Sequence, residues 1–370
     1  MYVPVLRAKA SEWKALAALS PGVRRWIAPI LEFVPEWRGP GSPTSTRKRR
    51  APQTPTEYVR RMLEAAASST PANTRSLVYF GHGGANAIWS GVDLWAAFAS
   101  AAPSGGRTVP LVDLDAVAGL ASVPAVVQRT GGEVGLRLHA NELNASLAGR
   151  TQAAIRQLGA ITGTSHLIID LRDNPTAASH DQIRRAVANP AAFASIVVLA
   201  GVFPFDLTQY QTGVTPEARV EWDTWRREHL ATQAGDRFLC FGDYTTQCAH
   251  YRPSPALPGS VSLRYTTDGA ILVFRGNQAN SRAGLGYEQI HGHCRLLVGR
   301  QDYDGAAFSA GDRRIQCWTD PTRGPGNPEQ WRTACLVHHI THAVAQLQDA
   351  AGSSATARAW ARSQPAAACP

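Results

Sequence analysis

Short apolar runs alternate with helical patterns along the chain as far as about residue 245. The apolar runs are continuous, which is typical of strands in a parallel sheet whose two faces are both covered. Eight such strands are predicted, at residues 2–9, 26–34, 76–83, 108–115, 133–140, 166–173, 195–202 and 237–244. The pattern therefore indicates an α/β fold built on a parallel sheet.

Helical patterns lie between most of these strands. Thr54 before Pro55 marks the start of one helix, and Gly159 marks the end of another. The predicted helices span 11–19, 54–69, 86–102, 144–160, 179–190 and 216–233. Eight strands that are mostly followed by helices predict a TIM-like (β/α)8 barrel. A doubly wound sheet with a separate C-terminal domain is the alternative, but no GxGxxG turn follows the first strand.

The pattern changes after residue 245. Two apolar runs around Asp268 and Gly269 predict a β-hairpin. We expect a single barrel domain over residues 1–350, with a hairpin and loop insertion at 255–325. A long helix at 328–350 would then serve as the eighth barrel helix.

Two segments carry neither pattern. Residues 36–55 are rich in Pro, Gly and Ser around a basic centre at Arg47–Arg50, which predicts a flexible basic loop. A basic arm that binds a polyanion is the functional alternative to a solvated loop. Residues 351–370 are rich in Ala and Ser and are expected to form a disordered tail.

Charged residues stand where the predicted strands end. A parallel barrel gathers the C-terminal ends of all its strands on one rim, where functional sites lie. We therefore predict a ring of opposite charges. Its candidate catalytic carboxylates are Glu32, Asp113, Asp170 and Asp243. Its candidate ligand-binding residues are Arg7, Lys9, His82, Arg137, His139, Arg172 and Tyr244, with Arg264 and Arg275 of the hairpin as a second basic cluster.

The ring permits two interpretations. As a functional site, its cations would hold an anionic small molecule, and its carboxylates would orient those cations or transfer protons. As a structural feature, it would be a network of satisfied ion pairs that closes the barrel.

Composition favours a soluble protein. Of 370 residues, 44% are hydrophobic and 18% charged, and no run of about 18 apolar residues suggests a membrane span. The N-terminus lacks the basic-then-apolar order of a secretory signal. The six cysteines form no CxxC pair. We therefore expect a cytoplasmic protein with mostly free thiols.

The positive net charge of +9 is weak support for nucleic acid as a partner. Only three of the 37 basic residues are lysines, which indicates a coding bias towards arginine.

No motif names a cofactor or a reaction. The chain lacks a P-loop and the GxSxG elbow of α/β-hydrolases, although GHGG at 81–84 is reminiscent of an oxyanion loop. His338 and His342 have the i, i+4 spacing of helical zinc ligands, but His339 stands where HExxH requires Glu. We therefore predict no metal site, although the spacing leaves metal binding by His338, His339 and His342 open.

Four blocks of the chain resemble the beta protein family. They are MYVPVLRAKASEWKAL, IAPILEFVP, FGDYTTQ and SLRYTTDGAILVFRG, within a resemblance over about residues 1–345. They contain Arg7, Lys9, Glu32, Asp243, Tyr244, Arg264, Tyr265 and Arg275.

The family is named for a bacteriophage beta protein that prevents a partner killer protein, Gop, from killing the host, and its relatives occur among prophage and anti-phage defence genes. The resemblance implies an immunity, antitoxin-like or regulatory component with a toxin or defence protein as partner. It carries over no catalytic residue. An enzyme acting on a phosphorylated or carboxylated small molecule at the rim remains the alternative.

Overall fold

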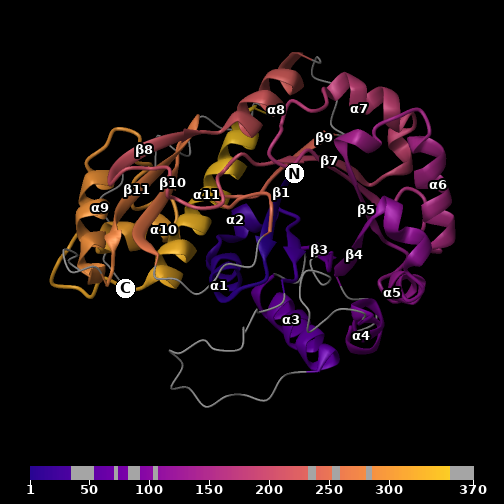
Figure 1. The fold of residues 1–370 in the computed structure, drawn as a ribbon, viewed down its shortest axis with the longest axis horizontal. Helices are drawn as coiled ribbons and strands as arrows, with labels where there is room; N and C mark the ends of the chain where they lie inside the picture. The colour runs from indigo at the N-terminus through magenta and orange to yellow at the C-terminus, as the bar shows by residue number, and fades with distance from the viewer. Residues whose placement is uncertain are drawn as a thin grey trace.

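Eight parallel strands close into a barrel, which confirms the predicted TIM-like architecture (Figure 1). The computed structural model describes residues 1–34, 54–70, 74–81, 92–102, 107–231, 239–251, 259–280 and 286–350. In order around the barrel, the strands are β1 (Tyr2–Arg7), β2 (Ile30–Glu32), β3 (Ser76–Tyr79), β4 (Thr108–Asp113), β5 (Gly135–His139), β6 (His166–Asp170), β7 (Ser195–Ala200) and β9 (Leu239–Asp243). Strand β9 pairs with both β7 and β1, and thereby completes the ring.

Helices coat the outside of the barrel (Figure 1). They are α1 (Ala10–Ala18), α2 (Pro21–Arg24), α3 (Pro55–Ser69), α4 (Leu94–Ala101), α5 (Val123–Arg129), α6 (Leu147–Gln157), α7 (His180–Val187) and α8 (Val220–Ala231), with short 3-10 turns at Leu114–Gly119, Ala140–Glu142 and Pro190–Ala192. The predicted start of α3 is confirmed, because the Thr54 hydroxyl accepts from the backbone N–H of Glu57 and the Glu57 carboxylate accepts from that of Thr54.

Two predicted flexible segments fall largely outside the described residues. These are the basic loop at 36–55, apart from its last two residues, and the whole tail at 351–370. Within the described ranges, no helix combines the length and the apolar character needed to cross a membrane.

Strand alternation divides the side chains between the barrel interior and the helical coat. The interior is filled by buried apolar side chains, among them Val3, Val5, Ile30, Leu77, Val109, Leu111, Ile168, Val197 and Leu199. The same inward face continues towards the strand ends with Arg7, Glu32 and Tyr79, which are register partners across β1, β2 and β3. A polar layer therefore rests directly on a packed apolar floor.

A second, three-stranded sheet stands beside the barrel. Its strands are β8 (Gly213–Ala218), β11 (Ala270–Gln278) and β10 (Ser260–Thr266), with β11 in the centre. The predicted hairpin is confirmed as β10 and β11. The predicted helix at 216–233 is wrong at its beginning, because residues 213–218 pair with β11 and the helix starts only at Val220. Exposed and half-buried residues alternate along β8, and its Pro216 is tolerated because β8 is an edge strand.

Three helices pack against this small sheet: α9 (Gln289–Val298), preceded by the 3-10 turn Gly286–Glu288, α10 (Ala310–Cys317) and α11 (Pro328–Ala350). Leu263, Tyr265 and Phe274 of the hairpin are buried against apolar residues of these helices, so the hairpin is not the solvent-facing element that its sequence also allowed. Helix α11 lies between the barrel and the small sheet, packing against α1 and β1 on one side and against β10 on the other (Figure 1).

The crossing of α10 and α11 needs a glycine. A Cβ atom on Gly311 would collide with the backbone carbonyl of Ala334. We predict that Gly311→Ala lowers the free energy of unfolding by about 1–3 kcal/mol, because the two helices must separate to admit the methyl group. Gly149→Ala in α6 is the matched control, since no atom lies within 4 Å of its added Cβ. Urea denaturation should show that Gly149→Ala retains or gains stability, and equal behaviour of the two variants would contradict this account.

Candidate functional site

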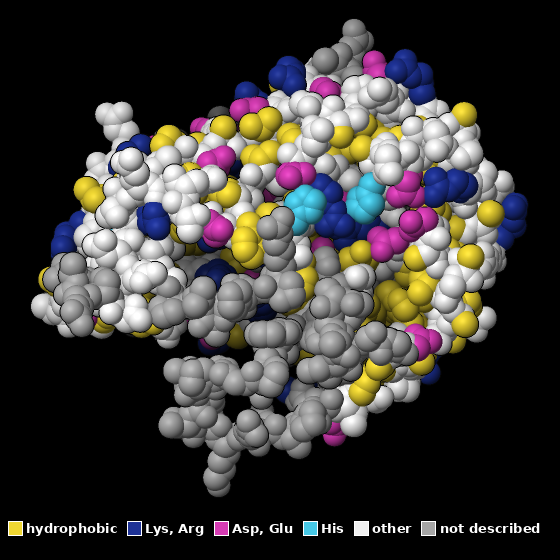
Figure 2. All heavy atoms as spheres, viewed as in Figure 1, with side chains coloured by type: hydrophobic (Ala, Val, Ile, Leu, Met, Phe, Trp, Pro, Cys, Tyr) yellow, Lys and Arg dark blue, Asp and Glu magenta, His cyan; other side chains and the backbone are white. Residues whose placement is uncertain are grey.

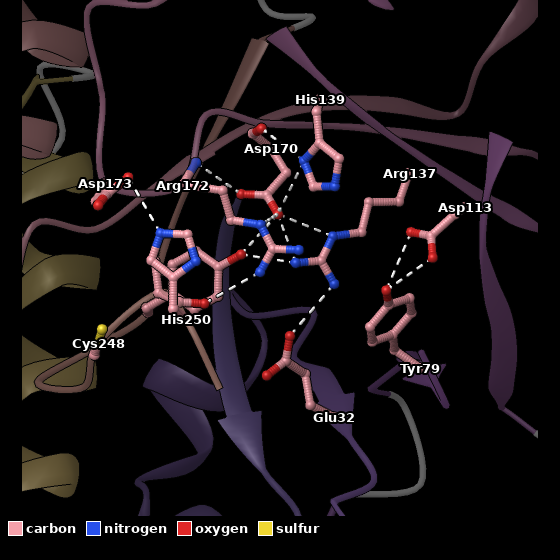
Figure 3. Close-up of polar contacts among 12 residues, drawn as sticks. Glu32, Tyr79, Asp113, Arg137, His139, Asp170, Arg172, Asp173, Cys248 and His250 are labelled. Carbon is pink, nitrogen blue, oxygen red and sulfur yellow. Dashed lines mark hydrogen bonds and ion pairs between the residues drawn. The ribbon is translucent and has the colours of Figure 1, made fainter. Parts of the chain in front are cut away.

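The inward polar layer forms a charged mouth at the C-terminal ends of the barrel strands. We define this charged mouth as Arg7, Glu32, Tyr79, Asp113, Arg137, His139, Asp170, Arg172, Tyr244 and the loop at residues 245–251 that follows β9. Figure 3 shows most of these side chains pointing towards one another from different strands.

Arg137 is the centre of the charged mouth and is only 1% exposed. Its Nε and Nη2 donate to Oδ2 of Asp170 over 3.0 and 2.5 Å, and its Nη1 donates to Oε1 of Glu32 over 3.3 Å. The Tyr244 hydroxyl donates to the same Asp170 oxygen over 2.7 Å. The guanidinium also lies over the ring of Tyr79, 4.4 Å from its centroid. One buried cation thus ties together four strands of the barrel.

Three arginines hold the loop at 245–251 through its backbone carbonyls. Arg7 donates to the carbonyls of Cys248 and His250, and Arg172 donates to that of Ala249. Arg264 of β10 donates to the carbonyl of Thr246. Three separate parts of the chain therefore hold the backbone of this loop in its place at the charged mouth.

Backbone strain is concentrated at the same place. Arg172 and Thr245 have φ angles of 54° and 57°, a region that residues other than glycine seldom occupy. Asp170 holds Arg172 in this conformation by accepting from its backbone N–H, and Asp243 does the same for Thr245. Strain of this kind persists where the surroundings enforce it, and it is common at functional sites.

Part of the charged mouth is open to solvent. The side chain of Arg172 is 23% exposed although its Nε lies 3.1 Å from Asp170, and those of His139 and His250 are 39% and 46% exposed. Figure 2 shows histidine side chains on both sides of a basic patch over the barrel. The open groups of the mouth therefore include Arg172 and two histidines, with the exposed Asp173 beside His250.

The structure brings together many of the residues that the sequence suggested. Arg7, Glu32, Asp113, Arg137, His139, Asp170, Arg172 and Tyr244 all lie at the charged mouth. Asp113 accepts from the hydroxyl of Tyr79 over 2.8 Å. His82 lies outside the described residues.

Lys9, Asp243 and Arg275 lie apart from this cluster, and Arg264 reaches only its loop, through the carbonyl of Thr246. Lys9 is exposed at the start of α1. Asp243 faces outwards, where it accepts from the Tyr2 hydroxyl and lies 3.1 Å from Nε2 of His339 on α11. Its neighbour Tyr244 points inwards because successive strand residues face opposite sides.

Arg264 and Arg275 lie on the face of the hairpin that meets residues 203–210. Arg264 stacks over the ring of Phe203, and Arg275 donates to the carbonyl of Tyr210. The two arginines of the predicted second basic cluster thus face residues 203–210, whereas Asp243 is engaged by Tyr2 and His339.

Comparison with protein families gives one match over nearly the whole chain. The family model described as Beta protein matches residues 2–345. The chain belongs to the beta protein family. No curated protein and no solved structure gives a significant match.

In this beta family chain, several members of the charged mouth were not predicted from the sequence. Tyr79 could have been found from strand register, since it lies level with Glu32 on the neighbouring strand. His250, which lies 3.2 Å from Asp173, and Gln247 had no signal, because they belong to a loop whose path depends on the arginines that bind it.

The buried Asp170 of the beta family site is held as an anion. Burial alone would raise the pKa of Asp170, but Arg137 and Arg172 beside it hold that pKa below its usual range. Burial raises the pKa of Tyr244 well above its ordinary value, and likewise that of Tyr79, so both remain neutral phenols.

A separate group of potential metal ligands lies on the other side of α11. Asp304, His338 and His342 are buried, and one ligand atom from each lies within 4.8 Å of the others. This group is distant in sequence from the residues of the charged mouth and belongs to the contact of α11 with α10 and the small sheet.

The central arginine gives a stability test in the beta family chain. We predict that Arg137→Met lowers the free energy of unfolding by about 3–5 kcal/mol, because it leaves Asp170 and Glu32 buried without their shared cation. The matched control is Arg150→Met, which removes a half-exposed pair with Glu142 and should change stability by less than about 1 kcal/mol. Guanidinium denaturation of both variants makes the comparison, and similar values would show that the buried network contributes little.

Proposed function

We propose that the charged mouth binds an anionic group of a ligand, a carboxylate or a phosphate, and that this binding serves a regulatory or immunity role in a prophage or anti-phage defence system. The observation that carries the proposal is Arg172, a strained and partly open arginine that is fixed directly over a neutralised buried network.

The balance of charge at the mouth favours an anion. Glu32 and Asp170 are fully buried and paired with Arg137, so they contribute little repulsion at the surface. The open guanidinium of Arg172 offers donors that suit the flat oxygen pairs of carboxylates and phosphates. His139 and His250 lie close by and supply further donors.

Preorganisation also supports binding. Arg172 is held by Asp170 on one side and by the carbonyl of Ala249 on the other, so little side-chain entropy remains to be lost when a ligand arrives. An arginine placed only to balance a buried charge would not need a strained backbone.

Membership of the beta protein family supports the regulatory or immunity role, because the resemblance implies a partner protein whose toxicity is controlled. The alternative is an enzyme that acts on a phosphorylated or carboxylated small molecule at the same mouth. His139 favours this alternative, since it offers an open imidazole beside the predicted anion site, with its Nδ1 3.3 Å from the backbone carbonyl of Asp170.

Anion binding can be tested by thermal shift. We expect the melting temperature to rise with inorganic phosphate or citrate, because either anion would bind the folded chain at Arg172. Arg172→Gln should weaken this binding about ten- to a hundredfold through the loss of charged hydrogen bonds. The control is Arg60→Gln, which removes an exposed arginine of α3 and should leave the response unchanged. The same response in both variants would rule out the charged mouth as the anion site.

The immunity role has its own test. When the chain is co-expressed with the product of a neighbouring gene that is toxic alone, we expect growth to be restored and the two proteins to purify together. Arg172→Gln should reduce the rescue if the ligand site regulates the complex. If growth is not restored and no complex purifies, the immunity role is rejected. Turnover of a phosphorylated compound that His139→Ala abolishes would establish the enzyme instead.

A further inference from the structure

Three buried histidines of α11 connect this helix to its surroundings. His338, His339 and His342 are all at most 2% exposed. Each faces an aspartate from another part of the chain, namely Asp312, Asp243 and Asp304 respectively. The three histidines nevertheless differ in the group that lies next to their second ring nitrogen.

His338 has an oxygen acceptor at both ring nitrogens. Its Nε2 lies 2.7 Å from the backbone carbonyl of Thr266, which can only accept, so Nε2 carries a hydrogen. Its Nδ1 lies 3.0 Å from Oδ2 of Asp312. That carboxylate oxygen already accepts from the Ser309 hydroxyl. A neutral His338 would therefore point a lone pair at a carboxylate, which is unfavourable in a buried site.

His342 repeats this arrangement one turn later. Its Nδ1 lies 2.8 Å from Oδ2 of Asp304, and its Nε2 lies 3.4 Å from Oδ1 of Asp268. The Nε2 atom is buried and makes no hydrogen bond of normal geometry within the described residues. His342 therefore shares with His338 an aspartate at Nδ1, but its Nε2 lacks the close acceptor that Thr266 gives to His338.

His339 provides the contrast on the same helix. Its Nε2 faces Asp243, but its Nδ1 lies 2.8 Å from the hydroxyl of Thr266, which can donate. A neutral His339 satisfies both contacts with one ring hydrogen, so it needs no additional positive charge.

The rings of His338 and His342 lie side by side, with centroids 5.6 Å apart, and both are buried beside aspartates. One ligand atom from each of Asp304, His338 and His342 lies within 4.8 Å of the others. A single divalent ion between these atoms would contact all three side chains and would offset the buried charge of Asp304.

We propose that Asp304, His338 and His342 bind a divalent transition metal. Imidazole and carboxylate donors suit zinc in particular, with bonds of about 2 Å that place neighbouring tetrahedral ligands about 3.3 Å apart. The 2.8 Å between Nδ1 of His342 and Oδ2 of Asp304 is near this spacing, and the ligand atom of His338 lies within 4.8 Å of both. Thr266 and Asp268 lie behind the two Nε2 atoms, where acceptors orient metal-binding histidines.

The ion would strengthen a connection that hydrogen bonds and packing already make between two parts of the chain. His338 and His342 belong to α11, and Asp304 belongs to the segment before α10. The metal would thus fix this segment on the long helix that also covers the barrel. Its role would be structural, because Asp304, His338 and His342 are all buried.

The test measures metal content in the tag-free full chain. After expression in zinc-supplemented medium and gel filtration, we expect elemental analysis to find about one zinc ion per chain. A chelator should remove it and lower the melting temperature, and added zinc should restore both. Replacement by Co²⁺ should give the visible absorption of a tetrahedral site, which two protonated histidines cannot produce.

Variants separate this site from general destabilisation. His342→Gln and Asp304→Asn should lose the metal, whereas His339→Gln, the matched control on the same helix, should retain it even if its melting temperature falls. Circular dichroism tests whether each purified variant is folded. If His342→Gln does not fold, Asp304→Asn provides the test of metal loss. Wild-type protein that neither contains nor takes up zinc, cobalt or manganese would overturn the proposal, as would metal content that His339→Gln lowers as much as His342→Gln.

Discussion

The arrangement of the barrel mouth depends on the burial of Arg137. A guanidinium removed from water is tolerated only when anions and hydrogen-bond acceptors surround it. Asp170 and Glu32 meet that need from different sides of the barrel, and Glu32 is 105 residues away in the sequence. The Asp170 carboxylate also orients Arg172, because it pairs with the Arg172 guanidinium and accepts from the Arg172 backbone N–H. The open part of the mouth is therefore positioned by the charge balance of its buried part.

Most of the barrel could be predicted from the sequence, because a strand covered on both faces leaves a continuous apolar run that needs no knowledge of its neighbours. The small sheet was harder to predict. Its strand β8 contains Pro216, lacks a continuous apolar run and becomes a strand only through pairing with β11, more than fifty residues later in the chain. Local preference could not supply that partner, so the sequence pattern predicts too early a start for the helix after β8.

The rim residues show a similar limit. The ends of the strands could be located, but the direction of each side chain depends on strand parity and on where the strand stops. Asp243 and Tyr244 are neighbours in the chain, yet one faces α11 and the other faces Arg137. Lys9 lies beyond the end of β1, where the chain has already turned into a helix. The loop at 245–251 could not be foreseen at all, because its path follows three arginines from distant elements.

Helix α11 connects the small sheet to the barrel. It buries apolar residues against the barrel and against the small sheet. Its histidines make polar contacts on both sides, to Asp243 of the barrel and to Asp304 and Asp312 beside the small sheet. Such contacts act over short distances and require a defined rotation of the helix. Arg264 extends the connection, since it leaves the small sheet to hold the carbonyl of Thr246 at the mouth.

This connection bears on how a barrel of this kind could act in regulation. Acid–base catalysis requires a group that gains and loses a proton near its working pH. At the mouth, the arginines keep Asp170 ionised and burial keeps Tyr79 and Tyr244 neutral. Such a network is suited to hold a fixed charge in a fixed place, which is what recognition needs. An anion at Arg172 would contact a side chain that shares the loop at 245–251 with Arg264. The loop at 245–251 therefore links the charged mouth to the small sheet, because it follows β9 and is held by Arg264 of β10.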